Sequence, residues 1–118
     1  MSFARQLKSA TATIERNMNR TWKRSVVQAF SQTVLKTPVD TGAARNSWLL
    51  GSQNNGDIGS SRLTINSQKI PDIGGQVLLY SNLPYIEVLE DGSSQQAPQG
   101  MVKVTVSQWP GIVRSNEV

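Results

Sequence analysis

Two stretches decide the fold, TPVDTGAARNSW at residues 37–48 and NLPYIEVLEDGSSQQAPQGM at residues 82–101. Both hold proline, glycine and capping residues at spacings that stop one helix and start another. In the first stretch, Pro38 has no amide hydrogen and forces Thr37 out of the helical region. A helix that arrives from the N-terminal side therefore ends at this point.

The rest of the first stretch predicts a short second helix at residues 42–48. Asp40 or Thr41 supplies a side-chain oxygen that caps its first turn. Arg45 lies within reach of Asp40 or of a carboxylate on another molecule. Trp48 closes the core, although tryptophan and arginine are also common anchors of protein interfaces.

The second stretch repeats this pattern. Pro84 opens a short helix at residues 85–90, in which we expect Tyr85 to pack inward. Gly92 is placed to end that helix in the left-handed conformation. The segment from Ala97 to Gly100, which includes Pro98, restarts the chain.

Residues 3–36 predict one long helix, since apolar side chains recur there at three- and four-residue steps without proline or glycine. They are Phe3, Leu7, Ala10, Ile14, Met18, Trp22, Val26, Phe30 and Val34. Such a helix is about 50 Å long, whereas a compact domain of this size is roughly 35 Å across. The helix therefore bends, frays at its start, or projects with an apolar stripe that another subunit covers.

Three strands are expected after the second helix, at residues 47–52, 62–67 and 76–81. The middle one rests on Leu63 and Ile65 alternating with polar residues. A turn at residues 54–57 and a loop at 69–75 separate the strands. The prediction is an α+β fold, with the long N-terminal helix packed on a small, mostly antiparallel sheet.

The chain of 118 residues is expected to form a single domain, with residues 37–113 as its α+β body. Residues 101–113 fit either a strand or a helical face, and Pro110-Gly111 would bend or end a helix. Residues 114–118 are expected to be disordered.

The paired stretches resemble the minor tail-component family of long-tailed bacteriophages, which includes the lambda-type tail-completion protein Z. With the long helix in front, the resemblance covers most of the chain, although residues 53–75 are not diagnostic. The matching residues are Thr37, Pro38, Val39, Asp40, Thr41, Gly42, Arg45, Ser47 and Trp48 in the first stretch, and Asn82, Pro84, Tyr85, Leu89, Glu90, Gly92, Ala97, Pro98, Gly100 and Met101 in the second.

This resemblance implies a structural virion protein at the head–tail junction, a minor tail or neck protein made in the host cytoplasm. Its role would be tail completion and head–tail joining during virus assembly. It would act as a homo-oligomer, a ring of six copies or alternatively twelve. Its partners would be the tail terminator or tail tube protein and the head-connector proteins. The resemblance also favours a helix at residues 101–113.

Composition argues against an enzyme. The chain has no cysteine and no histidine, which removes thiol nucleophiles, thiolate metal sites and the commonest general base at neutral pH. No nucleophile elbow, phosphate loop or paired-carboxylate motif occurs. No catalytic residue, cofactor or metal site is expected. No apolar run is long enough to span a membrane.

Charge is uneven along the chain, whose net charge is +4. Before residue 37 the chain has seven basic residues, and its one acidic residue there is Glu15. In the second stretch, Glu87, Glu90 and Asp91 form a cluster of acidic residues, which we call the acidic corner. The basic side chains of the helix either face solvent, contact the acidic corner of the next subunit, or contact DNA in a channel without sequence specificity. The candidate interface residues are Arg16, Arg20, Lys23, Arg24, Arg45, Glu87, Glu90 and Asp91. A non-specific nucleic-acid-binding module that uses the basic helix is the alternative function.

Overall fold

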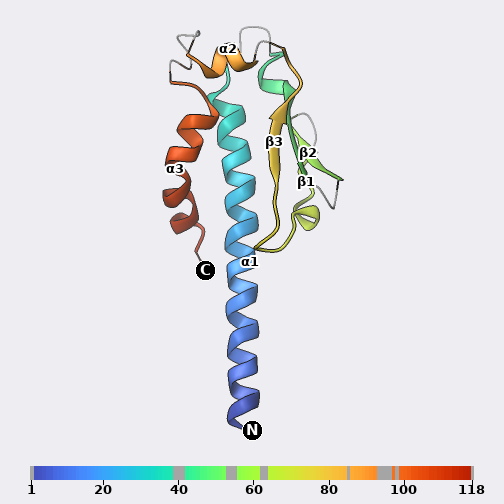
Figure 1. The fold of residues 1–118 in the computed structure, drawn as a ribbon, viewed down its shortest axis with the longest axis vertical. Helices are drawn as coiled ribbons and strands as arrows, with labels where there is room; N and C mark the ends of the chain where they lie inside the picture. The colour runs from blue at the N-terminus through green and yellow to red at the C-terminus, as the bar shows by residue number, and fades with distance from the viewer. Residues whose placement is uncertain are drawn as a thin grey trace.

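The computed structural model describes residues 2–38, 42–52, 56–61, 64–84, 86–92, 97 and 99–117. The fold is α+β, as predicted, with α1 between a small sheet on one side and α3 on the other (Figure 1). In chain order the elements are α1 (Phe3–Lys36), the 3-10 turn η1 (Arg45–Ser47), β1 (Trp48–Ser52), β2 (Gly56–Ser60), the 3-10 turn η2 (Ser67–Lys69), β3 (Leu78–Ser81), α2 (Ile86–Glu90) and α3 (Val102–Ser115).

The predicted long helix is confirmed as one continuous element of 34 residues. Ser2 caps its start, where the Arg5 amide donates to the Ser2 hydroxyl at 3.2 Å. It ends at Thr37, whose backbone is extended just before Pro38. That ending follows from proline's exclusion of the helical conformation at the residue before it.

The sheet is antiparallel, with the strand order β2-β1-β3. β1 is the central strand, and it pairs Trp48 with Ser81 and Gly51 with Leu78 on β3. The expected strands at residues 47–52 and 76–81 are therefore confirmed, with the second one shorter by two residues. A bulge interrupts the pairing of β1 with β2 after Leu50.

The strand expected at residues 62–67 is wrong for residues 64–67, which form no strand and enter η2 at Ser67, while residues 62 and 63 lie outside the described residues. One of the two strands that pair with β1 comes earlier, at Gly56–Ser60, and it begins at Gly56, whose positive φ of 66° suits glycine. Ile58 is the buried residue of this strand. The described residues after it cross over Gly59, where an added Cβ would lie 2.8 Å from the Ile65 Cα.

Three other expectations about the ends of elements need correction. The helix expected at residues 42–48 is only the single turn η1, since Trp48 already begins β1. The ambiguous tail is a helix, and α3 runs through Pro110 and Gly111 without ending there. Disorder from residue 114 on is also wrong, because α3 reaches Ser115 and the Asn116 amide donates to Gln28 on α1 at 2.7 Å. Val118 lies outside the described residues.

The core lies where α1, the sheet and the start of α3 meet. Its members are buried apolar side chains from elements far apart in the sequence, and these include Val26, Phe30, Trp48, Leu50, Ile58, Ile70, Ala97 and Met101. Every one of them comes from the C-terminal part of α1 or from the chain after it. The N-terminal part of α1 therefore contributes nothing to the core.

The molecule is elongated because α1 is longer than the body that packs on it. Its principal extents are 61 × 27 × 18 Å. The N-terminal end of α1 projects from the body as a straight helix with no other described element beside it (Figure 1). Of the three outcomes expected for this helix, the structure has the projecting one.

Candidate interaction surfaces

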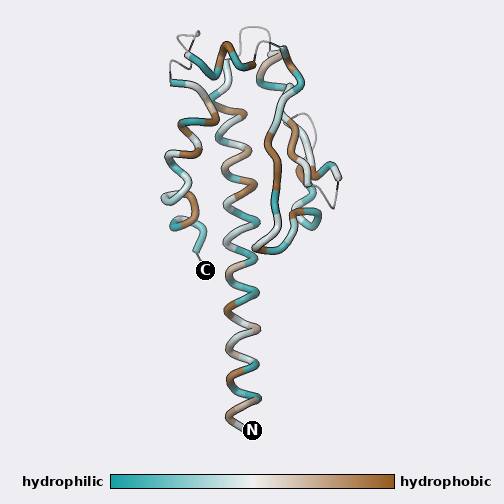
Figure 2. The backbone as a smooth tube through the Cα atoms, in the orientation of Figure 1, coloured by the Kyte–Doolittle hydropathy of each residue, from teal (hydrophilic) through white to brown (hydrophobic). Residues whose placement is uncertain are grey.

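The projecting part of α1, residues 3–18, is called the stalk below. It carries large apolar side chains that are well exposed, namely Phe3 at 78%, Leu7 at 56%, Ile14 at 58% and Met18 at 46%. Apolar positions recur along the whole stalk (Figure 2). A helix this exposed gains little from packing, so the stripe gives the stalk a strong tendency to bind another apolar surface.

The stripe of the stalk continues the face of α1 that α3 covers. On that face, Lys36 Nζ donates to the Gln108 side-chain oxygen of α3 at 2.7 Å, and the Gln28 side-chain oxygen accepts from Asn116, the residue after α3, at 2.7 Å. Met18 lies about five helical turns before Lys36, on the same side. The apolar face is therefore covered by α3 in the body and left open along the stalk.

An open groove of about 640 Å³ lies where the stalk enters the body. Trp22 and Trp109 meet there edge to face, with ring centroids 6.0 Å apart. Trp22 also donates to the Pro71 carbonyl at 2.9 Å, which places it in the body as expected for a packing residue. The groove is lined by Ile14, Asn17, Met18, Thr21, Trp22, Ile73, Trp109, Val113 and Glu117.

The basic candidates of α1 lie on other faces of the helix. Arg20, Lys23 and Arg24 line a second groove of about 630 Å³ together with Val27 and Asn116. Lys23 forms an ion pair with Asp72 at 3.3 Å. Arg16 lies on the stalk, where its guanidinium donates to the Thr13 hydroxyl at 3.1 Å. The structure thus brings three of the four basic candidates together.

Arg45 binds the C-terminal end of α1 within its own chain. Its guanidinium donates to the carbonyls of Leu35 at 3.0 Å and Thr37 at 3.1 Å. These carbonyls are the free acceptors at the end of α1, where a cation is favourable. The Arg45 Nε atom is buried and has no hydrogen-bond partner within the described part of the chain. Asp40, the partner expected from the sequence, lies outside the described residues.

A buried series of hydrogen bonds connects β1, α1 and α3. The Trp48 indole donates to the Thr37 hydroxyl at 2.8 Å, and that hydroxyl donates to the Thr33 carbonyl at 2.7 Å. The Thr33 hydroxyl lies 3.0 Å from the Thr105 hydroxyl of α3. The sequence did not predict the hydrogen bond between Thr33 and Thr105. A threonine inside a helical pattern does not indicate which distant residue its hydroxyl will bind.

Glu90 is also used within the protein. Its carboxylate accepts backbone N–H groups of Met101, Val102 and Lys103, each at 2.9 Å, and so caps the start of α3. Desolvation raises the pKa of Glu90, but these three backbone hydrogen bonds together with the Lys103 charge outweigh it and lower the pKa below the usual value. Glu90 therefore is a capping residue that docks α2 against α3.

Gly100 is the other part of this junction that sequence reasoning missed. It has a φ of 87°, and an added Cβ would lie only 2.5 Å from the Glu90 carbonyl oxygen. The sequence shows that Gly100 precedes Met101, but it does not show that Gly100 packs against Glu90 at the end of α2. Of the acidic corner, Glu87 and Asp91 remain exposed, and Asp91 lies 3.6 Å from Lys103.

Glu90→Gln should lower the free energy of unfolding by about 1–2 kcal/mol at pH 7, as expected for a lost helix cap. The folded-state pKa of Glu90 is lowered, so its stabilisation is fully present above the unfolded value of about 4.5 and is lost as the pH falls through the lower folded value. Urea unfolding from pH 7 to pH 3 should show the gap between wild type and variant closing below about pH 4.5.

The matched control is Glu87→Gln on the same helix, because Glu87 is exposed. It should change the free energy of unfolding by less than about 0.5 kcal/mol at every pH. A Glu90 variant as stable as this control at pH 7 would contradict the capping role.

The other residues of the two stretches occupy turns. Gly42 and Gly92 have positive φ values of 75° and 92°, and the Gly92 amide donates to Leu89 at the end of α2. Pro38 is buried just after α1, and Pro84 precedes α2. The remaining predicted motif residues lie outside the described residues, and these are Asp40, Thr41, Tyr85 and Pro98.

Among the described residues, no group of three or more acidic side chains could hold a metal ion. No helix within the described ranges has the length and apolarity needed to cross a membrane. No protein-family model, curated protein or solved structure matches this chain.

Proposed function

We propose that this protein is a structural virion protein of the phage head–tail junction, which completes the tail and docks it to the head connector. The resemblance of residues 37–48 and 82–101 to the tail-completion family supports the location. The protein would act without a reaction, as a ring of six copies or alternatively twelve.

The observation that carries the docking mechanism is the stalk. A helix that exposes Phe3, Leu7, Ile14 and Met18 at 46–78% is poorly suited to remain alone in water. Its body is already complete, because the core uses only later residues. The stalk is thus free to bind neighbouring subunits without any change in the body.

Charge supports contacts between neighbouring copies. Arg20, Lys23 and Arg24 line one groove of the body, whereas Glu87 and Asp91 are exposed at α2 and just after it. Opposite charges on different parts of one surface favour a head-to-tail contact, which generates a ring when the rotation closes. Within the chain, Glu90 and Arg45 bind backbone groups and Lys23 and Asp91 form ion pairs with Asp72 and Lys103. The proposed contact therefore rests mainly on the exposed Arg20, Arg24 and Glu87.

Cryo-electron microscopy of particles that contain this protein tests the proposal. We expect density for the protein between the tail tube and the head connector, with six-fold or twelve-fold symmetry. Density elsewhere in the particle, or no density at all, would overturn the proposed role.

The rival function, non-specific nucleic-acid binding, is favoured by the groove that Arg20, Lys23 and Arg24 share. Such binding weakens steeply as salt rises, because each neutralised phosphate releases counterions. We expect weak binding of random duplex DNA by the isolated protein even at low salt. Tight and steeply salt-dependent binding that Arg20→Ala and Arg24→Ala reduce equally would favour the rival.

A further inference from the structure

We propose that in the free protein a second copy covers the stalk, and that the two stalks pair in an antiparallel arrangement. The paired surface is the apolar stripe formed by Phe3, Leu7, Ala10, Ile14 and Met18. The two stalks would pair in the protein before it joins any larger assembly.

A second copy is a suitable occupant because the stripe and the groove at its base form one surface. Ile14 and Met18 belong to both, and Trp22, Trp109 and Val113 extend the same surface into the body. A stalk that lies along this surface buries its own stripe against the partner's stripe. A patch that is complementary to itself gives a two-fold dimer.

The order of side chains along the stripe favours the antiparallel direction. Large residues stand at both ends and the small Ala10 stands in the middle. When the two-fold axis passes between residues 10 and 11, Leu7 lies opposite the partner's Ile14 and Phe3 opposite the partner's Met18. The small side chains at the axis allow the two helices to approach closely.

This arrangement also gives the groove an occupant. Phe3, the most exposed large apolar side chain of the stalk, would lie over the mouth of the partner's groove. Glu117 lines that groove, and its carboxylate would face the N-terminal end of the partner's helix, where negative charge is favourable.

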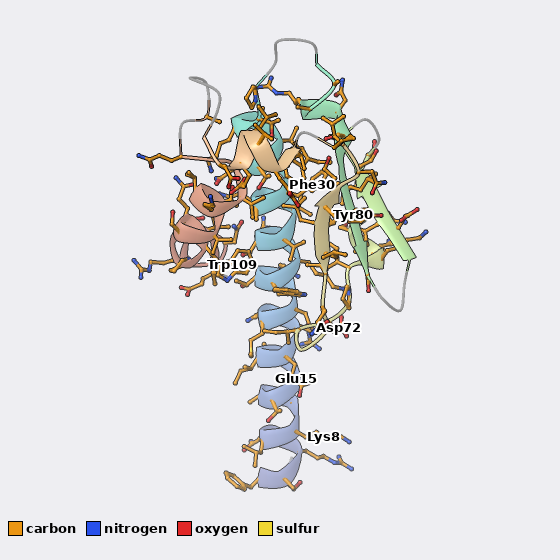
Figure 3. All side chains as sticks on the ribbon, turned by 45° about the horizontal axis from the view of Figure 1, so that its top comes forward. Lys8, Glu15, Phe30, Asp72, Tyr80 and Trp109 are labelled. Carbon is orange, nitrogen blue, oxygen red and sulfur yellow. The ribbon has the colours of Figure 1, made fainter. Side chains whose placement is uncertain are left out.

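Charge on the flank of the stripe fits the same direction. Lys8 and Glu15 are both exposed and stand clear of the body (Figure 3). They are about two helical turns apart, so they lie on the same side of the stalk. In an antiparallel pair equal flanks face each other, which places Lys8 of one copy beside the partner's Glu15 and repeats the contact through the two-fold axis. In a parallel pair these two residues lie on opposite sides.

The contact involves about four helical turns from each copy. That is small for a permanent interface, so we expect a reversible dimer with a dissociation constant on the order of micromolar. Neck assembly would replace this contact with contacts to neighbouring subunits. The dimer would thereby keep the stripe out of water until partners are present.

Introduced cysteines test the direction of the pair, and the chain has none of its own. Near the axis, Ala10→Cys should form an intermolecular disulfide on mild oxidation, since helices packed about 8 Å apart bring these positions together. The control Asn17→Cys lies on the same side of the stalk but about 20 Å from its copy in an antiparallel pair, so it should stay reduced. Crosslinking of Asn17→Cys, or of neither variant, would overturn the proposal.

Sedimentation equilibrium with charge variants tests the contact independently. Lys8→Glu and Glu15→Lys should each raise the dissociation constant of the dimer about tenfold, because two attractive pairs become repulsive. The double variant restores opposite charges and should return to within about twofold of wild type. A wild-type protein that stays monomeric at about 100 µM, or a double variant weaker than both single ones, would refute the antiparallel pair.

Discussion

Trp48→Ala is expected to lower the free energy of unfolding by about 3–5 kcal/mol. Trp48 is 4% exposed and lies in the core with Val26 and Phe30 of α1. Removal of its indole leaves a large cavity between β1 and α1. The total free energy of unfolding of a chain this long is about 6–18 kcal/mol, so this loss is a large part of it. A loss of this size should lower the unfolding temperature by roughly 10–25 °C.

Loss of the indole N–H adds a second cost. Trp48 Nε1 donates to the Thr37 hydroxyl, which in turn donates to Thr33. Trp48→Phe keeps most of the apolar volume but not this donor, so it should cost less, on the order of 1–2 kcal/mol. The two variants together separate the packing of Trp48 from its hydrogen bond.

The matched control for Trp48→Ala is Trp109→Ala on α3. Trp109 is only partly buried and meets Trp22 at the edge of the body. Its loss should cost less than half as much in thermal unfolding followed by circular dichroism at equal protein concentration. An equal loss of unfolding free energy in Trp48→Ala and Trp109→Ala would contradict a central place of Trp48 in the core.

The long helix and its end could be predicted because the information is local. The apolar spacing of residues 3–36 and Pro38 after Thr37 act through neighbouring residues alone. The same is true of Gly92 at the end of α2, where a positive φ is needed. The middle strand was expected too late in the chain because the apolar Ile65 was assigned to a strand, whereas it packs closely over Gly59 of β2.

The roles of Arg45 and Glu90 could not be read from the sequence in the same way. Arg45 was expected to pair with Asp40 or with a carboxylate on another molecule, and Glu90 was expected to contact a neighbouring subunit. Their actual partners are backbone groups of other elements, the end of α1 for Arg45 and the start of α3 for Glu90. A contact that depends on how distant elements pack leaves no periodic pattern in the chain.

The second large effect is expected from Leu7→Asp combined with Ile14→Asp on the stalk. Both side chains are more than half exposed, so the body should keep the stability of wild type. Each charge would lie at the centre of the stripe that the proposed docking buries, where an unpaired carboxylate is strongly unfavourable. We expect head–tail joining to fall by at least about a hundredfold.

The control for that variant is Ser9→Asp with Thr13→Asp, which adds the same charge away from the stripe. Ser9 and Thr13 are exposed, and the stripe residues lie on another side of the helix. This variant should join heads and tails within about threefold of wild type. Circular dichroism of both double variants should show the same helix content.

The most direct test of the stalk as the docking element is therefore the joining of purified heads to tails that lack this protein, after addition of each double variant. We expect joined, infectious particles with wild type and with Ser9→Asp/Thr13→Asp, and none above background with Leu7→Asp/Ile14→Asp. Normal joining by the stripe variant, with its body folded, would contradict this role of the stalk.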